Sequence, residues 1–249
     1  MSNIPAVIIA AGSGSRIETR HNQVPKTLLP VDSENRIIDL IIQSLRQADI
    51  TEIIIVTGYK GSLLRKELGN GKSHNVTVCY ITNPGWKEPN GISVLAASQA
   101  VGNREFILVM SDHLFKAKTV SKLKSFPLSN GGAVVAIDRA IRQIYDIDDA
   151  MKLKTEQTGQ HYLIKAMDKK LKRYDSVDCG LFKGTPEMFT ALKIANKKGR
   201  CSLSNGCEEL IKMNKLLGCD ITGDFWIDID TTSALQVARE SWKKDRLSQ

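Results

Sequence analysis

Two kinds of hydrophobic pattern alternate along the first half of the chain. Short, continuous apolar runs are typical of strands buried in a parallel sheet. Between them, apolar residues recur at helical spacing, as at positions 37, 38, 41, 42 and 45. The predicted order is strand Ala6–Ala10, helix Ile37–Gln47, strand Glu52–Gly58, helix Leu63–Leu68, strand Val76–Ile81, helix Ile92–Ala100 and strand Glu105–Ser111. This alternation predicts a doubly wound, mostly parallel α/β sheet.

The second half of the chain is less regular. Its apolar runs predict the strands Gly132–Ile137, Ala150–Thr155, Tyr162–Ala166, Asp175–Phe182 and Leu217–Ile221. Its helical patterns predict the helices Thr185–Ala195 (with Pro186 in the first turn), Ser204–Asn214 and Thr232–Trp242. The second and third strands are expected to form a hairpin or small sheet. Since no repeat, low-complexity tract or linker interrupts the pattern, we expect a single domain over residues 1–249.

Composition places the chain among ordinary globular proteins. It has 249 residues, of which 42% are hydrophobic and 25% charged. No stretch approaches the roughly 20 apolar residues of a membrane span, and Met1–Pro5 lacks the charged leader of a signal peptide. The five cysteines contain no Cys-x-x-Cys pair, which favours free thiols in a reducing compartment. We therefore expect a cytoplasmic protein without membrane insertion.

The net charge of +8 raises the question of nucleic-acid binding. Basic residues gather at Lys165–Lys172 and Lys193–Arg200, but aromatic residues are only 6% of the chain and do not interleave with these runs, as base stacking would require. A positive field around a site for small anions explains the charge equally well. No nucleic-acid partner is expected.

The segment that begins at Val7 carries the clearest chemical signal. Its apolar run ends in a loop of small residues, followed by Arg16 and then by Pro25 and Lys26. The loop residues are Ala10, Ala11, Gly12, Ser13 and Gly14. Glycines let a backbone approach a ligand closely and direct its N–H groups at phosphate oxygens, while arginine and lysine supply cationic partners. The segment predicts a nucleoside triphosphate site.

Two commoner phosphate loops are excluded by spacing. The dinucleotide fingerprint would need a third glycine at Ile17, and a Walker loop ending at Lys72 and Ser73 would need its first glycine at Lys66. The alternative is an ordinary strand-to-helix turn, against which Arg16 and Lys26 argue.

Three aspartates are candidate metal ligands. Asp112 follows a predicted strand at the sheet edge where ligands bind, and Mg²⁺ prefers one or two carboxylates together with phosphate oxygens. Asp228 and Asp230 would share one face of a strand, about 7 Å apart, where like charges favour a cation between them. The alternatives are helix caps at Asp112 and Asp230 and a solvated strand face.

These motifs resemble those of the sugar-1-phosphate nucleotidyltransferase superfamily, whose loop reads small-Ala-Gly-x-Gly-x-Arg followed by Pro-Lys. Later segments match as well: Asn90-Gly91, Met110–His113, Val177–Gly180 and Trp226–Thr231. Together they look most like the cytidylyltransferases that act on inositol 1-phosphate, with bacterial cholinephosphate cytidylyltransferases as near relatives. The resemblance implies a GT-A-like fold with a small β-rich lid, a nucleotide-binding half over 1–131, and an acceptor-binding half with a closing helix over 132–249.

The resemblance also implies roles on the nucleotide side. Arg16 and Lys26 would contact the phosphates undergoing transfer, and the glycine loop would hold the nucleotide. Mg²⁺ would be held by Asp112 with a later acid, for which Asp230 is preferred to Asp228. At Asn90 and Gly91 the base would approach the backbone, although an Asx turn is the alternative for Asn90.

On the acceptor side, Lys152 and Lys169 match lysines that bind the substrate phosphate in related enzymes. Asp178 would bind polyol hydroxyls, or act as a buried structural acid. His113 is interpreted as a hydrogen-bonding residue at a helix start, because an anionic phosphate needs no general base to attack.

The expected reaction is Mg²⁺-dependent transfer of a nucleotidyl group, by preference cytidylyl from CTP, to a polyol or sugar 1-phosphate, by preference inositol 1-phosphate, with release of pyrophosphate. Cholinephosphate is one rival acceptor, because Tyr145, Tyr162, Tyr174 and Trp226 could surround a quaternary ammonium. Hexose 1-phosphates with other nucleotides are another. From a different class, a non-catalytic nucleotide-sugar-binding domain is the alternative, and a homodimer is left open.

Overall fold

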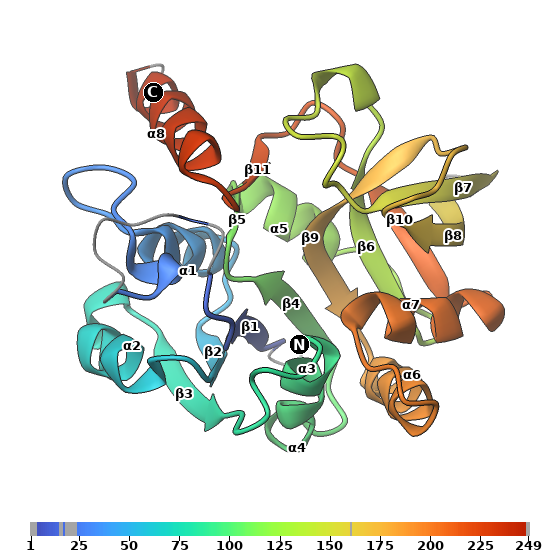
Figure 1. Ribbon diagram of the computed structural model, residues 1–249, viewed down its shortest axis with the longest axis horizontal. Coiled ribbons are helices and arrows are strands. Elements are labelled where there is room, and N and C mark those ends of the chain that lie inside the picture. Colours follow the sequence, from blue (N-terminus) through green and yellow to red (C-terminus); the bar gives the residue numbers. More distant parts are fainter. Residues whose placement is uncertain (1–3, 15–16, 18–23, 160, 248–249) are drawn as a thin grey trace.

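The computed structural model describes residues 4–14, 17, 24–159 and 161–247. The first half forms a block of four parallel strands in the order β3, β2, β1 and β4 (Figure 1). Their bounds are Ala6–Ala10 for β1, Glu52–Thr57 for β2, Thr77–Thr82 for β3 and Phe106–Met110 for β4. The predicted parallel strands are confirmed, each within two residues of its expected ends.

Helices cover both faces of this block, because successive strand residues point to opposite sides. Ile8 packs in one apolar cluster with α1 (Ile37–Gln47) and α2 (Gly61–Leu68). Its neighbours on β1 pack in the other cluster with α3 (Gly91–Ala96) and α4 (Ser98–Val101). The chain is thus doubly wound. The predicted helix over 92–100 is divided at Ala97.

The second half extends the same sheet to nine strands, in the order β3-β2-β1-β4-β9-β6-β10-β8-β7. The added strands are β6 (Ala133–Asp138), β7 (Lys152–Thr158), β8 (His161–Asp168), β9 (Ser176–Gly184) and β10 (Leu216–Asp220). β9 lies antiparallel between β4 and β6, so it joins the two halves. β7 and β8 form the expected hairpin, and β7 also pairs with the start of β9. The overall class, a mostly parallel α/β sheet, holds.

Helices α6 (Pro186–Lys197) and α7 (Leu203–Lys212) cover the second half on the α3 side of the sheet. Side chains of Thr185 and Ser202 cap their first turns, so both helices begin where polar residues interrupt the pattern. The chain ends in α8 (Thr232–Leu247). Within the described residues, no helix combines the length and the apolar character needed to cross a membrane.

A second, two-stranded sheet positions the chemistry. β5 (His113–Phe115) pairs antiparallel with β11 (Trp226–Asp228), and α5 (Ala117–Lys124) follows β5. The hydrophobic pattern did not predict β5 or α5. Because the backbone N–H of Ile229 also donates to the Asp112 carbonyl at 2.9 Å, the ends of β4 and β11 are held side by side.

Candidate active site

The glycine loop follows the carboxyl end of β1. The Tyr59 N–H donates to the Ala11 carbonyl at 2.9 Å, which ties the loop to the end of β2. At Gly14 the backbone has φ +62°, and a Cβ there would lie 2.7 Å from the Cβ of Lys26. The loop therefore needs glycine at this position, and it lies against Lys26. The predicted Arg16 lies outside the described residues.

Lys26 opens a short 3-10 helix, Lys26–Leu28, directly after Pro25. Its Nζ donates to Asp112 Oδ2 at 2.8 Å and to Asp230 Oδ1 at 2.6 Å, and its side chain is only 10% exposed. Burial alone would lower the pKa of Lys26, but the two carboxylates outweigh burial and raise it. The ammonium is therefore charged and lies between two of the predicted metal ligands.

Neither Asp112 nor Asp230 stands at the position directly before a helix. β5 follows Asp112, and α5 begins only after Lys116. At the start of α8, the Thr231 hydroxyl accepts from the Ala234 N–H at 3.1 Å. Burial acts to raise the pKa of Asp112, but the Lys26 ammonium and His113 outweigh it and hold that pKa below its usual range. Asp112 is thus an ionised carboxylate in the site.

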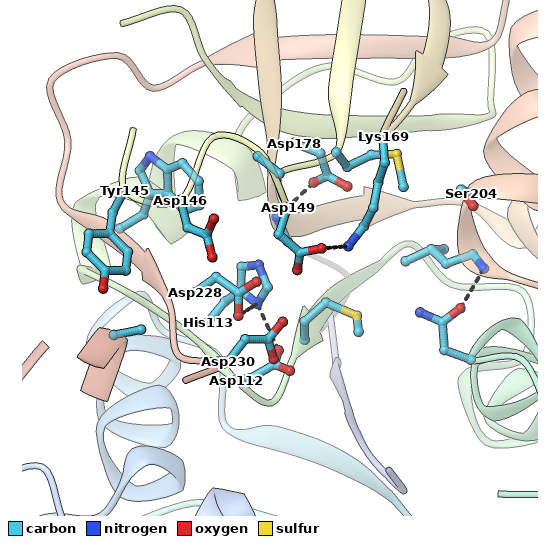
Figure 2. A pocket seen from close by; sticks show the side chains of 18 of the residues that line it. Asp112, His113, Tyr145, Asp146, Asp149, Lys169, Asp178, Ser204, Asp228 and Asp230 are labelled. Carbon is cyan, nitrogen blue, oxygen red and sulfur yellow. Dashed lines mark hydrogen bonds and ion pairs between the residues drawn. The ribbon is translucent and has the colours of Figure 1, made fainter. Parts of the chain in front are cut away.

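His113 lies on strand β5, so the expectation of a helix start is wrong, because β5 pairs with β11. The expected hydrogen bond is present: His113 Nδ1 lies 2.8 Å from Asp112 Oδ1, and it also lies 3.7 Å from Asp228 Oδ1 (Figure 2). A Cβ at Gly180, where φ is +74°, would come within 2.3 Å of the His113 ring. The imidazole is therefore fixed against the backbone of β9.

The charged groups around His113 shift one another's pKa values. Burial disfavours the imidazolium, but Asp228 and Asp112 outweigh burial and raise the pKa of His113 to about 9. Burial raises the pKa of Asp228 to about 6. Asp228 Oδ1 is buried and has no hydrogen-bond partner among the described residues. Such an oxygen is what a ligand or cation would satisfy.

The acids of this site fit a hard divalent cation. Ligand atoms of Asp112, His113 and Asp228 lie within 4.8 Å of one another, and Asp230 shares the Lys26 ammonium with Asp112. Carboxylate oxygens are the ligands that Mg²⁺ prefers, and Asp228 Oδ1, which accepts no hydrogen bond among the described residues, adds an available donor. The predicted convergence of distant carboxylates is present in the fold.

Asn90 and Gly91 form the start of α3, as expected. The Asn90 Oδ1 accepts from the Leu203 N–H at 2.8 Å, at the first turn of α7. A Cβ on Gly91 would lie 2.4 Å from the Cys201 carbonyl oxygen. The segment is therefore docked on the turn before α7, which explains its glycine by packing.

Two cavities meet at this centre. One, of about 290 Å³, is lined by the glycine loop, Lys26 and Trp86, and the other, of about 280 Å³, opens toward β8 and β9. Both are lined by Asn90, Met110, Asp112 and Asp230. Two ligands could therefore approach the same carboxylates from opposite sides.

The second cavity is rich in carboxylates (Figure 2). Lys169 lies in it and contacts Asp149 Oδ1 at 2.6 Å. Asp178 accepts the Gly180 N–H at 2.7 Å, and burial raises its pKa to about 6. Asp146, Asp149 and Ser204 also line this cavity, although their sequence context did not predict it. Asp146 and Asp149 are loop residues without periodicity, and Ser204 lies in the first turn of helix α7.

Lys152 is placed differently from Lys169. The residue is 8% exposed, and its Nζ donates to the carbonyls of Asp148 at 3.2 Å and Lys169 at 3.0 Å. These bonds hold the loop before β7 to the turn after β8. Lys152 thus supports the wall of the cavity from behind, and Lys169 lies within the cavity.

Comparison with known proteins defines the class. The family model described as nucleotidyl transferase matches residues 5–244, and the chain belongs to this family. Among solved structures, the inositol-1-phosphate CTP transferase from T. maritima superposes with a TM-score of 0.80 at 20% identity, covering 95% of this chain and 94% of that one. A UDP-glucose pyrophosphorylase superposes with a TM-score of 0.81 at 17% identity, covering 97% and 99%. These likenesses show the GT-A-like fold.

Curated relatives lie nearer in sequence. The bifunctional IPC transferase and DIPP synthase of Rubrobacter xylanophilus is 29% identical over 240 residues, which is 95% of this chain and 51% of the relative. The protein of the same name from Thermococcus kodakarensis is 29% identical over 236 residues, covering 94% and 49%. The chain thus spans about half the length of the curated relatives it matches.

Proposed function

We propose that this nucleotidyltransferase moves a cytidylyl group from CTP to inositol 1-phosphate and releases pyrophosphate, with Mg²⁺ as its cofactor. The observation that carries the proposal is the pair of cavities that share Asp112 and Asp230 beside Lys26. Such a site can bring two anions together and offset their repulsion, which is most of what this chemistry requires. The names of the IPC transferase relatives support the choice of base and acceptor.

The proposed reaction is an in-line displacement. A phosphate oxygen of the acceptor forms a bond to the α-phosphorus of CTP while the bond to the β-phosphate oxygen breaks, and pyrophosphate leaves with that electron pair. Lys26 and Arg16 bind the phosphates, and the backbone from Ala10 to Gly14 holds the nucleotide with Asn90 and Gly91. Mg²⁺, held by Asp112 with Asp230 or Asp228, would neutralise charge on the triphosphate. No covalent intermediate on the protein is needed.

The second cavity supports a polyol phosphate as acceptor. In the proposal, Lys169 binds the acceptor phosphate, Asp178 accepts hydrogen bonds from hydroxyls, and Lys152 supports this wall. A hydroxyl-rich ring suits several carboxylates, since each accepts hydrogen bonds from it. Of the four aromatic residues that could surround choline, only Tyr145 and Trp226 line the cavity as the described residues outline it. This favours inositol phosphate over cholinephosphate.

A substrate matrix tests the proposal. The protein with Mg²⁺ is incubated with each of the four ribonucleoside triphosphates and with inositol 1-phosphate, cholinephosphate or hexose 1-phosphates, and pyrophosphate release is measured. CTP with inositol 1-phosphate should give the highest kcat/KM. Highest turnover with another pair would overturn the base or the acceptor. No release with any pair would favour a non-catalytic domain.

The variant Asp112→Asn is the matched control for that assay. It removes one negative charge and keeps the shape of the side chain, so we expect turnover to fall by at least about 10²-fold while circular dichroism stays unchanged. Near-normal Mg²⁺-dependent turnover in this variant would refute the assignment of Asp112.

A further inference from the structure

The Lys26 ammonium occupies a place that a metal ion would also need. We propose that Lys26 is an internal counter-ion for Asp112 and Asp230, and that its transfer from these carboxylates to the triphosphate couples metal binding to nucleotide binding. The inference rests on the proposed function, because it takes these acids as the metal site. It adds an order to binding: the metal site becomes available when the nucleotide draws Lys26 away.

The first step of the argument is competition for the same oxygens. Lys26 Nζ holds Asp112 Oδ2 at 2.8 Å and Asp230 Oδ1 at 2.6 Å. Mg²⁺ binds carboxylate oxygens at about 2.0–2.1 Å with strict geometry, so an ammonium on both oxygens competes with it for them. The buried setting strengthens the repulsion between the two cations, since little water screens it.

The second step is that the two oxygens of Asp112 have different partners. His113 Nδ1 holds Oδ1 at 2.8 Å, and its ring is fixed against Gly180 on β9. Lys26, by contrast, reaches Oδ2 on a flexible stem of four methylenes. Oδ2 is therefore the oxygen that can exchange partners. This favours Asp230, whose Oδ1 shares the same ammonium, over Asp228 as the second ligand.

The third step is that Lys26 has a destination close by. Its Cβ lies directly over Gly14, and its side chain lines the cavity of the glycine loop together with Gly12. Pro25 fixes the backbone that precedes it, so rotation of the side chain alone can carry the ammonium toward bound phosphates. A triphosphate thus attracts the group that blocks the metal.

The inference is tested by metal binding without turnover. Mn²⁺ is titrated into wild-type protein and Lys26→Gln, and the free ion is followed by its electron paramagnetic resonance signal. Because the competing ammonium is gone, Lys26→Gln should bind Mn²⁺ about tenfold or more tightly than wild type in the absence of nucleotide. The titration is repeated with α,β-methylene-CTP, and the Mn²⁺ bound by the free nucleotide is subtracted. The nucleotide should raise the Mn²⁺ affinity of the wild-type protein more than that of Lys26→Gln.

Lys154→Gln is the matched control. Lys154 lies on β7 and pairs with Asp175, and replacing it with glutamine changes the net charge by the same amount as Lys26→Gln. Its Mn²⁺ affinity should equal that of wild type. Lys26→Arg keeps a positive group near the acids and should keep Mn²⁺ binding weak. Lys26→Met, which also removes the ammonium, replaces Lys26→Gln in the titration should the glutamine variant not fold.

Two outcomes would overturn the inference: unchanged or weaker Mn²⁺ binding when the ammonium is removed, or an equal gain in Lys154→Gln. Either outcome leaves the proposed reaction standing if CTP and inositol 1-phosphate still turn over. Conversely, tighter Mn²⁺ binding by Lys26→Gln, with no turnover of any substrate pair by the wild-type protein, would support the inference and overturn only the proposed reaction.

Discussion

Asp112 is the residue on which the site is organised, because each of its oxygens has a cationic partner. Lys26 holds one oxygen and His113 the other, from opposite sides of the carboxylate. Neither contact could be derived from spacing, since Lys26 precedes Asp112 by 86 residues and the histidine orientation depends on strand β11. The residue types were predictable from motifs. Their pairing in the fold was not.

His113→Gln should make stability less dependent on pH between neutral and alkaline conditions. In the wild-type protein the pKa of His113 is raised from 6.5 to about 9, so the folded state holds the imidazole proton more tightly than the unfolded chain does. The resulting stabilisation is complete below pH 6.5 and is lost as pH rises toward 9. A pKa rise of this size corresponds to about 3–4 kcal/mol at most.

Urea unfolding at pH 6.5 and at pH 9.5 measures this effect. The loss of unfolding free energy in His113→Gln, relative to wild type, should be larger at the lower pH. An equal loss at both values would mean that His113 contributes through packing against Gly180 alone.

At the scale of elements, prediction succeeded where a local pattern is sufficient. Helix α1 has the ends expected from its apolar spacing, and β1, β2 and β4 of the parallel block are buried runs as predicted, whereas β3, at the edge, is only partly buried. Strand β5 has only three residues, too few to show a period of two, whereas the strand expected around Asp228 and Asp230 is found as β11 but ends at Asp228. They exist because they pair with each other across more than 100 residues of sequence. That pairing brings Asp112 to Asp228 and Asp230.

The contact between α3 and the turn before α7 gives a prediction at this scale. Gly91→Ala should lower the unfolding free energy by about 2 kcal/mol, because its Cβ would lie 2.4 Å from the Cys201 carbonyl and backbone cannot easily move. Gly206→Ala, in helix α7, is the matched control. Its Cβ would meet Leu192 Cδ2 at 2.6 Å and Cγ at 2.8 Å, which are side-chain atoms and yield more readily than a backbone carbonyl.

Thermal and chemical unfolding of both variants should show the larger loss for Gly91→Ala. The helix propensity gained from alanine, about 1 kcal/mol in a helix interior, favours Gly206→Ala more than Gly91→Ala, because Gly206 lies inside α7 and Gly91 is the first residue of α3, so it adds to the expected difference. A larger loss for Gly206→Ala would show that the turn at Cys201 yields more easily than the Leu192 side chain.

At the scale of the whole molecule, strand β9 makes the two halves into one sheet. It runs antiparallel between β4 and β6, whereas the sequence predicted only a mostly parallel sheet. An apolar run buried on both faces looks the same in either direction, so its orientation could not be read from the pattern. Because β9 carries Asp178 and Gly180, its position also places the second cavity beside the carboxyl end of β4.

In this arrangement each half of the chain supplies the cavity for one substrate, and Lys169→Met can test this division. Lys169 lines the second cavity and has no place in the lining of the glycine-loop cavity as the described residues outline it. We expect the KM for inositol 1-phosphate to rise about tenfold, because a charged contact to phosphate is lost, while the KM for CTP stays unchanged. Lys165→Met is the control, since Lys165 lies on β8, the strand that Lys169 follows, and pairs with Glu156. Equal increases in both KM values for Lys169→Met would mean that the lysine acts on the whole site through Asp149, and the assignment to the acceptor would fall.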